Sequence, residues 1–240
     1  MMEKSPTNEF NRFDENYKII NEMINKAAEK SGRKSSDITL LAATKTVSPE
    51  FIRHAITSGI TAIGENRVQE FLMKYEVVYK NKCDSQFIGR LQSNKVSQIV
   101  GKVSCIQSVD SLKLAKIISQ QSVKNNAVTK ILIEVNIGKE ESKGGVMPEE
   151  LYEFLDEIRL FPNISVDGLM AIPPIYEKKS DLCASFSAMM QYYVDIRSKK
   201  IDNIHMNCLS MGMSSDFSEA IECGATLVRI GSALFGVRGI

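Results

Sequence analysis

An alternation of apolar segments with helical segments, repeated eight times, constrains the fold of this chain more than any other feature. Most of the apolar segments are hydrophobic at consecutive positions, which indicates strands that are buried on both faces. Such strands alternating with helices are typical of a parallel sheet that is covered by helices. The expected strands cover residues 38–43, 61–63, 86–88, 103–107, 128–137, 164–170, 205–209 and 225–230.

The number of strands selects the architecture. Eight strand–helix units favour closure into a barrel over an open doubly wound sheet, and barrels of roughly 250 residues form one domain. An additional amphipathic helix is expected over residues 11–30, where apolar residues recur at helical spacing. We therefore predict an α/β fold with a single (β/α)8 TIM-type barrel over about 38–236, preceded by an extra N-terminal helix, as one domain spanning 1–240.

Composition argues against several classes of protein. The formal net charge is +1, so no basic surface for nucleic acid is indicated, and no apolar run approaches the roughly 20 residues of a membrane span. Five cysteines without a C-x-x-C pair favour a reducing compartment, and two histidines are too few for a histidine-based metal site. The polar start shows no apolar signal core. We expect a cytoplasmic protein without metal, membrane or nucleic-acid partners.

A lysine follows the first expected strand. Lys45 precedes a helix whose start is marked by Ser48-Pro49-Glu50, and barrel enzymes place their chemistry at the carboxyl ends of strands. An apolar surround would disfavour the ammonium form and leave an amine that can attack an aldehyde. The alternative is an ordinary loop lysine with its charge in water.

Two loops near the end of the chain have the features of an anion site. Residues 210–216 follow the seventh strand and contain Ser210, Gly212 and Ser214, while Gly231 and Ser232 follow the eighth. Barrels often bind phosphate with these two loops, because free amides at the start of a short helix attract anions. The alternative for the serines is plain helix capping.

An arginine on the last strand requires a partner. Strand alternation places Arg229 on the opposite face from its apolar neighbours, and a buried arginine must find an anion or an acceptor. A salt bridge with Glu134 or Asp167 would satisfy it. So would the ring nitrogen of a ligand, which would then stay unprotonated and be a weak electron sink.

Two further residues lie at strand ends with open alternatives. Asn66 follows the second strand and could orient a ligand or cap a helix. Met170 ends the sixth strand and could pack under a flat ligand or fill the core. Lys143, in the segment 140–145, could add a cation near the mouth, although exposure to solvent is the simpler expectation.

Five segments together resemble the pyridoxal phosphate homeostasis proteins, stand-alone relatives of the alanine racemase N-terminal barrel. The segments are LLAATKT, IGENRVQE, FIGRLQSNK, GLMAIPP and LSMGMSSDFSEAIECGATLVRIGSALFG, which extend from Leu40 to Gly236. The resemblance implies that Lys45 forms an internal aldimine with pyridoxal 5'-phosphate (PLP) and that Arg229 faces the pyridine nitrogen. It also implies a phosphate surround of Ser210, Ser214, Gly231 and Ser232, with Asn66 and Met170 flanking the cofactor. Gln86 stands where the family usually has histidine.

The resemblance also implies a role. The family binds PLP in intracellular vitamin B6 homeostasis without established turnover, and apo PLP enzymes are candidate partners. The resembled racemase takes its second base from a C-terminal domain, whereas this chain ends just after the last strand. No catalytic residue is therefore assigned, and a monomer is expected. An active PLP-dependent amino-acid racemase is one alternative. A barrel that binds another phosphorylated metabolite, with Lys45 as a simple cation, is the second.

Overall fold

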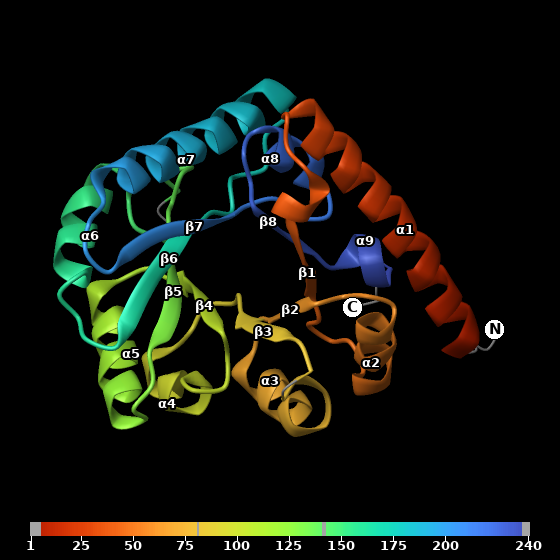
Figure 1. The fold of residues 1–240 in the computed structure, drawn as a ribbon, viewed down its shortest axis with the longest axis horizontal. Coiled ribbons are helices and arrows are strands. Elements are labelled where there is room, and N and C mark those ends of the chain that lie inside the picture. The colour runs from red at the N-terminus through yellow and green to blue at the C-terminus, as the bar shows by residue number, and fades with distance from the viewer. Residues whose placement is uncertain (1–5, 81, 141–142, 237–240) are drawn as a thin grey trace.

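Eight parallel strands close into a barrel in the computed structural model, which describes residues 6–80, 82–140 and 143–236 (Figure 1). Each strand pairs with the next along the chain, and β1 closes the ring by pairing with β8. The predicted (β/α)8 barrel is confirmed. The strands are β1 (Thr39–Ala43), β2 (Ala62–Glu65), β3 (Asp84–Phe87), β4 (Cys105–Val109), β5 (Thr129–Glu134), β6 (Ile164–Met170), β7 (Ile204–Ser210) and β8 (Leu227–Ile230).

Helices surround the barrel, as the alternating pattern predicted (Figure 1). They are α1 (Pro6–Lys30), α2 (Pro49–Thr57), α3 (Val68–Lys74), α4 (Val96–Ile99), α5 (Leu112–Lys124), α6 (Leu151–Ile158), α7 (Lys179–Lys199), α8 (Phe217–Glu222) and α9 (Ser232–Phe235). Short 3-10 turns precede β1 (η1, Ser35–Asp37), α4 (η3, Ser93–Lys95) and α6 (η4, Pro148–Glu150), and a π-helical turn extends α3 (η2, Tyr75–Tyr79). Within these residues, no helix has the length and apolar character to span a bilayer.

The extra N-terminal helix is confirmed and begins five residues before the expected start, at Pro6. It packs along the outside of the barrel against α8 and α9 (Figure 1). Phe13 is 1% exposed and lies 5.4 Å, centroid to centroid, from the ring of Phe235 in α9. The side-chain amide of Asn16 donates to the carbonyl of Leu234 at 3.0 Å. Helix α1 therefore supports the short helix that follows the last strand.

Two element boundaries differ from the sequence prediction for local reasons. The strand expected over 128–137 ends at Glu134, because the backbone of Asn136 turns to donate to the carbonyl of Val146. The segment after the second strand, which its sequence predicts as one helix over 68–80, is α-helical only to Lys74 and then widens into η2. Such π-helical turns often mark functional sites, and this one carries Tyr79 into the interior.

Strand alternation divides the core into two layers. Even positions of β1 face the helices, whereas Leu41 belongs to a small cluster inside the barrel and Ala43 packs against it. Met170 closes a second interior cluster with Cys105 and Leu132. The backbone of β7 approaches β6 closely at Gly168, where a Cβ would lie 1.8 Å from the carbonyl oxygen of Cys208. Arg229 shares this interior face of β8 with Leu227, as alternation predicts.

Candidate functional site

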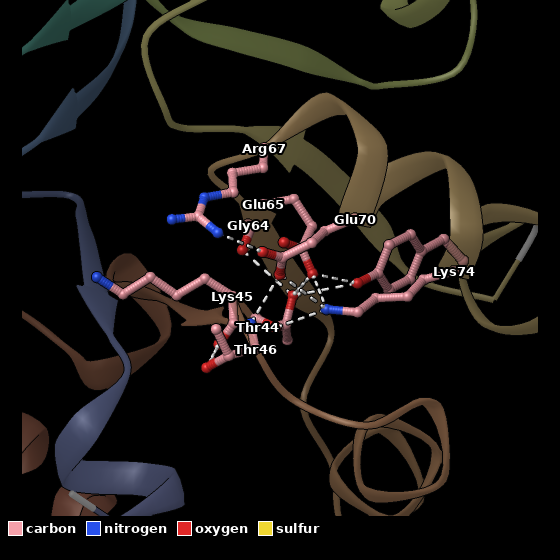
Figure 2. A network of polar contacts seen from close by, with 9 residues as sticks. Thr44, Lys45, Thr46, Gly64, Glu65, Arg67, Glu70 and Lys74 are labelled. Carbon is pink, nitrogen blue, oxygen red and sulfur yellow. Dashed lines mark hydrogen bonds and ion pairs between the residues drawn. The ribbon is translucent and has the colours of Figure 1, made fainter. Parts of the chain in front are cut away.

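Lys45 lies two residues beyond the end of β1, in step with the interior positions Leu41 and Ala43. Its side chain is exposed and extends away from the polar network around Thr44 (Figure 2). Of the two interpretations that the sequence left open, the structure therefore contradicts the apolar, desolvated surround and agrees with an exposed loop lysine. The amine lies at the barrel mouth, where an incoming aldehyde can reach it.

A buried polar network fixes the backbone that carries Lys45 (Figure 2). The Oε1 atom of Glu65, whose residue is 1% exposed, accepts hydrogen bonds from Lys74 Nζ at 2.6 Å, Tyr79 OH at 2.7 Å and Thr44 Oγ1 at 2.8 Å. Lys74 also donates to the carbonyl oxygen of Thr44 at 2.8 Å. Burial and the charge of Glu65 raise the pKa of Tyr79, so its hydroxyl remains a donor. The network therefore locks the ends of β1 and β2 together.

The same network reaches the turn after Lys45. Thr46 has a φ of 61°, in the left-handed region that non-glycine residues seldom occupy. Its amide donates to Glu70 Oε2 at 2.7 Å, and Glu70 lies 3.7 Å from Lys74 and 3.6 Å from Arg67 (Figure 2). Carboxylates on β2 and α3 thus hold both flanks of Lys45, which indicates a backbone position that is set before any ligand arrives.

Arg229 is the charged centre of the barrel interior and is only 5% exposed. Its Nη1 donates to Ser210 Oγ at 2.5 Å, and its Nη2 donates to the carbonyl of Ala171 at 3.0 Å. Burial lowers the pKa of Arg229 to about 10, against the opposing charges of Glu134 and Asp216. The guanidinium therefore carries its charge at neutral pH.

The salt-bridge alternatives for Arg229 are not formed among the residues that the structure describes. Asp167 lies 3.8 Å from Lys130 instead. Glu134 acts on Arg229 without a direct ion pair, and its own pKa is raised by burial and by Asp110, with Arg229 and Arg90 opposing. Arg229 is thus held by neutral acceptors, which leaves part of its charge uncompensated.

The two predicted phosphate loops meet at one hydroxyl. Ser214 Oγ accepts the amides of Gly231 and Ala233, both at 3.2 Å. Two N–H groups that converge on one oxygen atom at the start of a short helix are the arrangement that binds an oxyanion. A Cβ on Gly231 would lie 3.4 Å from the Cβ of Ala43, so this amide cradle lies beside the strand that carries Lys45. The exposed Ser232 opens α9 at the same place.

Two expectations about these loops need correction. Ser214 does not cap α8; Asp216 occupies the N-cap position, and its Oδ1 accepts the amide of Met213 at 2.6 Å. Ser210 is fully buried, and its hydroxyl accepts from Arg229 and donates to Gln107 at 2.7 Å. This interior position differs from the phosphate contact that the resemblance implied for Ser210.

Asn66 and Met170 lie on opposite sides of the barrel interior. Asn66 lines a cavity of about 300 Å³ at the mouth, together with Ile88, Gly89, Arg90, Asp110, Glu134, Val135, Asn136, Lys143, Gly144 and Ile172. Its Oδ1 is buried and has no hydrogen-bond partner among the described residues. Met170 is 1% exposed and packs in the interior cluster. Lys143 pairs with Glu140, while 141 and 142 lie outside the described residues.

The sequence analysis missed the residues that hold this site in place. Glu65 was assigned only to the loop after the second strand, Lys74 and Tyr79 only to a helix, and Gln107 only to a strand. A signal existed for Gln107, because a glutamine within an apolar strand of a barrel must find buried partners. Nothing in the spacing of Glu65 and Lys74 distinguishes a buried ion pair from an exposed one.

The arrangement is that of a (β/α)8 barrel that can hold a small anionic ligand at the carboxyl ends of its strands. Across the described residues, no three His, Cys, Asp or Glu side chains gather as a metal site. The anionic group would meet the amide cradle, and the remainder of the ligand would lie between the amine of Lys45 and the guanidinium of Arg229.

The chain belongs to the alanine racemase N-terminal domain family, whose profile matches residues 11–239, and within it to the pyridoxal phosphate homeostasis proteins. A protein of that name from Aquifex aeolicus is 48% identical over 217 residues, which cover 90% of this chain and 94% of the relative.

Solved structures show the same relationship. PipY of Synechococcus elongatus with PLP bound is 29% identical, covers 89% of this chain and 100% of its own, and has a TM-score of 0.77. Alanine racemase from Corynebacterium glutamicum shares the fold alone, at 14% identity and a TM-score of 0.70, over 96% of this chain and 62% of the racemase.

Proposed function

We propose that this chain binds PLP at the mouth of its barrel and serves intracellular PLP homeostasis. The observation that carries the proposal is the proximity of Gly231 to Ala43, because a Cβ on Gly231 would lie 3.4 Å from Ala43 Cβ and the amide cradle therefore lies beside the strand end that carries Lys45. PLP supplies a phosphate, a pyridine nitrogen and an aldehyde that condenses with primary amines. The cradle, Arg229 and Lys45 match these three groups in charge and chemistry. The relatives named above support the proposal.

Each residue would have one role in the proposed site. The amides of Gly231 and Ala233, with the hydroxyls of Ser214 and Ser232, would hold the phosphate, and Lys45 would supply the amine. Arg229 would face the ring nitrogen and, because it keeps its proton, would hold that nitrogen unprotonated. Asn66 and Met170 would flank the ring. Ser210 would orient Arg229, which replaces the phosphate contact first expected for it.

The absorbance spectrum of the purified protein tests this proposal. We expect a near-visible band after incubation with PLP, and borohydride should fix PLP to the peptide that contains Lys45, as detected by mass spectrometry. Lys45→Ala should lose the band and the labelled peptide, whereas Lys139→Ala, which removes an exposed lysine paired with Glu149, should keep both. A protein that remains colourless with excess PLP would reject the proposal.

Arg229 offers a second test at the ring. Arg229→Glu should favour a protonated ring nitrogen and change the position of the band, because a carboxylate there strengthens the ring as an electron sink. Arg33→Glu is the control, since Arg33 is part-buried and lies just after α1, away from the proposed site, where it donates to the carbonyls of Gly224 and Ala225. An identical spectrum for wild type and Arg229→Glu would remove the ring contact from the proposal.

The exposed amine favours cofactor carriage over turnover. Lys45 lies at an open mouth, where water weakens electrostatic catalysis but where an aldehyde can enter and leave. We therefore propose storage or delivery of PLP without racemase activity, with apo PLP enzymes as recipients. Transfer of bound PLP to an apo enzyme would support delivery. Interconversion of D- and L-amino acids, or deuterium exchange at their Cα, would show racemase activity instead.

The proposed cellular setting has its own tests. We propose a cytoplasmic monomer that folds as one domain, with α1 joined to the barrel. Light scattering on the eluted protein should give a mass near the 26.8 kDa of one chain. A mass of twice that value would replace the monomer with a dimer.

A further inference from the structure

A line of hydrogen bonds crosses the barrel interior from Arg229 to Asp84. Arg229 donates to Ser210 at 2.5 Å, and Ser210 donates to Gln107 Oε1 at 2.7 Å. Gln107 Nε2 then donates to Gln86 Oε1 at 2.6 Å, and Gln86 Nε2 donates to Asp84 Oδ2 at 2.6 Å. The line joins β8, β7, β4 and β3, and we call these five residues the interior relay.

The direction of the interior relay is fixed by its carboxylate end. The ionised carboxylate of Asp84 can only accept, so Gln86 must point its amide nitrogen toward it and its oxygen toward Gln107. Gln107 must then donate to Gln86 and accept from Ser210. The proton of the Ser210 hydroxyl is committed to Gln107, which leaves a lone pair for Arg229. One arrangement of donors therefore runs through the whole relay.

Burial makes this arrangement costly to break. Gln107 and Ser210 are both 0% exposed, Arg229 is 5% exposed and Gln86 is 8% exposed. Buried polar groups are expensive without partners, and each bond in a low-dielectric chain polarises the next. Asp84, by contrast, is exposed and begins β3 at the opposite end of the barrel from the mouth. The relay thus links an accessible carboxylate to the cation at the proposed ring site.

The interior relay determines the orientation of the Arg229 guanidinium. Ser210 Oγ and the carbonyl of Ala171 fix two of the five N–H donors of its guanidinium. If Gln107 were lost, the Ser210 hydroxyl could turn, and the guanidinium would be free to move toward the charge of Glu134, which already acts on it. The side chains that fix Arg229 therefore lie on strands remote from it in the sequence.

We propose that Gln107, Gln86 and Asp84 are positioning residues that hold the Arg229 guanidinium toward the ring nitrogen of PLP. This inference rests on the proposed PLP binding, and it adds that the cofactor's environment is set partly from the far end of the barrel. Ser210 belongs to the relay, so its contribution reaches the ligand through Arg229.

PLP titration of four full-length variants, followed by absorbance, tests the relay. Gln107→Leu and Gln86→Leu interrupt it with side chains of similar size. Gln86→His is the matched rescue, because an imidazole offers one donor for Asp84 and one acceptor for Gln107. Asp84→Asn removes the terminal charge at an exposed position and keeps an acceptor.

We expect Gln107→Leu and Gln86→Leu to weaken PLP binding about tenfold, which corresponds to about 1.4 kcal/mol of binding free energy. Both variants should also move the absorbance band. Gln86→His should match wild type, and Asp84→Asn should weaken binding by less.

A second measurement does not depend on PLP. Phenylglyoxal modifies accessible arginines, and peptide mapping gives the rate at Arg229 in the ligand-free protein, with Arg33 as an internal reference. The rate at Arg229, relative to Arg33, should rise several-fold in both leucine variants and stay at the wild-type value in Gln86→His.

The outcomes separate the two proposals. If the wild-type protein binds no PLP, while phenylglyoxal modifies Arg229 faster in the leucine variants, the proposed function is rejected and the positioning role is kept. Wild-type PLP affinity, spectrum and Arg229 reactivity in Gln86→Leu and Gln107→Leu would overturn the relay while leaving PLP binding intact. Equal behaviour of Gln86→His and Gln86→Leu would also overturn it. Should Gln107→Leu fail to fold, the comparison of the two Gln86 variants decides.

Discussion

Lys74→Met removes one partner of the buried ion pair behind Lys45 and is expected to destabilise the protein strongly. Lys74 Nζ lies 2.6 Å from Glu65 Oε1, and the two side chains are 7% and 1% exposed. Without the ammonium, the carboxylate of Glu65 keeps Tyr79 and Thr44 as donors but has no countercharge, while its Oε2 already lacks a partner among the described residues. Breaking such a pair from one side typically costs about 3–5 kcal/mol. The free energy of unfolding of a typical domain is only about 5–15 kcal/mol, so Lys74→Met should remove a large fraction of the stability.

Equilibrium unfolding in urea, monitored by circular dichroism, measures the change. Lys80→Met is the matched control, because Lys80 pairs with Glu76 at 3.0 Å across a solvent-exposed turn, with side chains 50% and 68% exposed. Exposed pairs add little, so the control should unfold at the wild-type midpoint. Lys74→Met should lower the midpoint without changing the slope.

A double variant separates the lost charge from the lost packing. Glu65→Leu with Lys74→Met removes both charges and should be more stable than Lys74→Met alone, because an apolar pair needs no countercharge. Lys74→Met should also slow formation of the PLP band, since Lys74 anchors the carbonyl of Thr44 next to Lys45. A midpoint equal to that of Lys80→Met, or a double variant no more stable than the single one, would refute the reasoning.

Three further changes test separate parts of the structure. Gly168→Ala places a Cβ 1.8 Å from the carbonyl oxygen of Cys208, so the β6–β7 ladder must shift. We expect the free energy of unfolding to fall by about 1–3 kcal/mol or more, measured by thermal unfolding. An unchanged melting temperature would contradict this packing. Ser214→Ala removes the shared acceptor of two amides and should weaken PLP binding roughly three- to tenfold in a titration. The control Ser215→Ala changes an exposed position and should bind PLP as wild type does. Glu134→Gln concerns a carboxyl whose pKa is raised in the fold, chiefly by burial, so ionised Glu134 opposes folding at neutral pH. The Glu134→Gln variant should therefore have a higher melting temperature than wild type at pH 7. This difference should vanish as the pH falls below the ordinary glutamate pKa of about 4.3, because the carboxyl is then protonated in both the folded and the unfolded state. A difference in melting temperature that grows with acidification would contradict this reasoning.

The barrel and the place of its site were predictable because they depend on local patterns. Segments apolar on both faces specify a parallel sheet, and architecture then places Lys45, Ser214 and Gly231 at one end of it. The face of Arg229 followed from strand alternation alone. These predictions needed no knowledge of which side chains touch.

The side-chain partners could not be predicted, because they depend on residues far apart in the chain. Ser210 was assigned to phosphate, yet its hydroxyl bonds to Gln107, 103 residues away. Lys74 is buried against Glu65, and Tyr79 reaches the same carboxylate from η2, a π-helical turn that the sequence did not predict. The exposure of Lys45 likewise depends on how the neighbouring loops close over β1, which periodicity does not describe.

Helix α1 gives the chain a late step in its biosynthesis. The Asn16 amide bonds to the carbonyl of Leu234, and these two residues are 218 positions apart. A ribosome must therefore release nearly the whole barrel before α1 can dock on α9. Until that contact forms, the segment after β8 lacks its support from α1. At the proposed site, a phosphorylated ligand would then find its complete amide cradle only after β8 and α9 have left the ribosome.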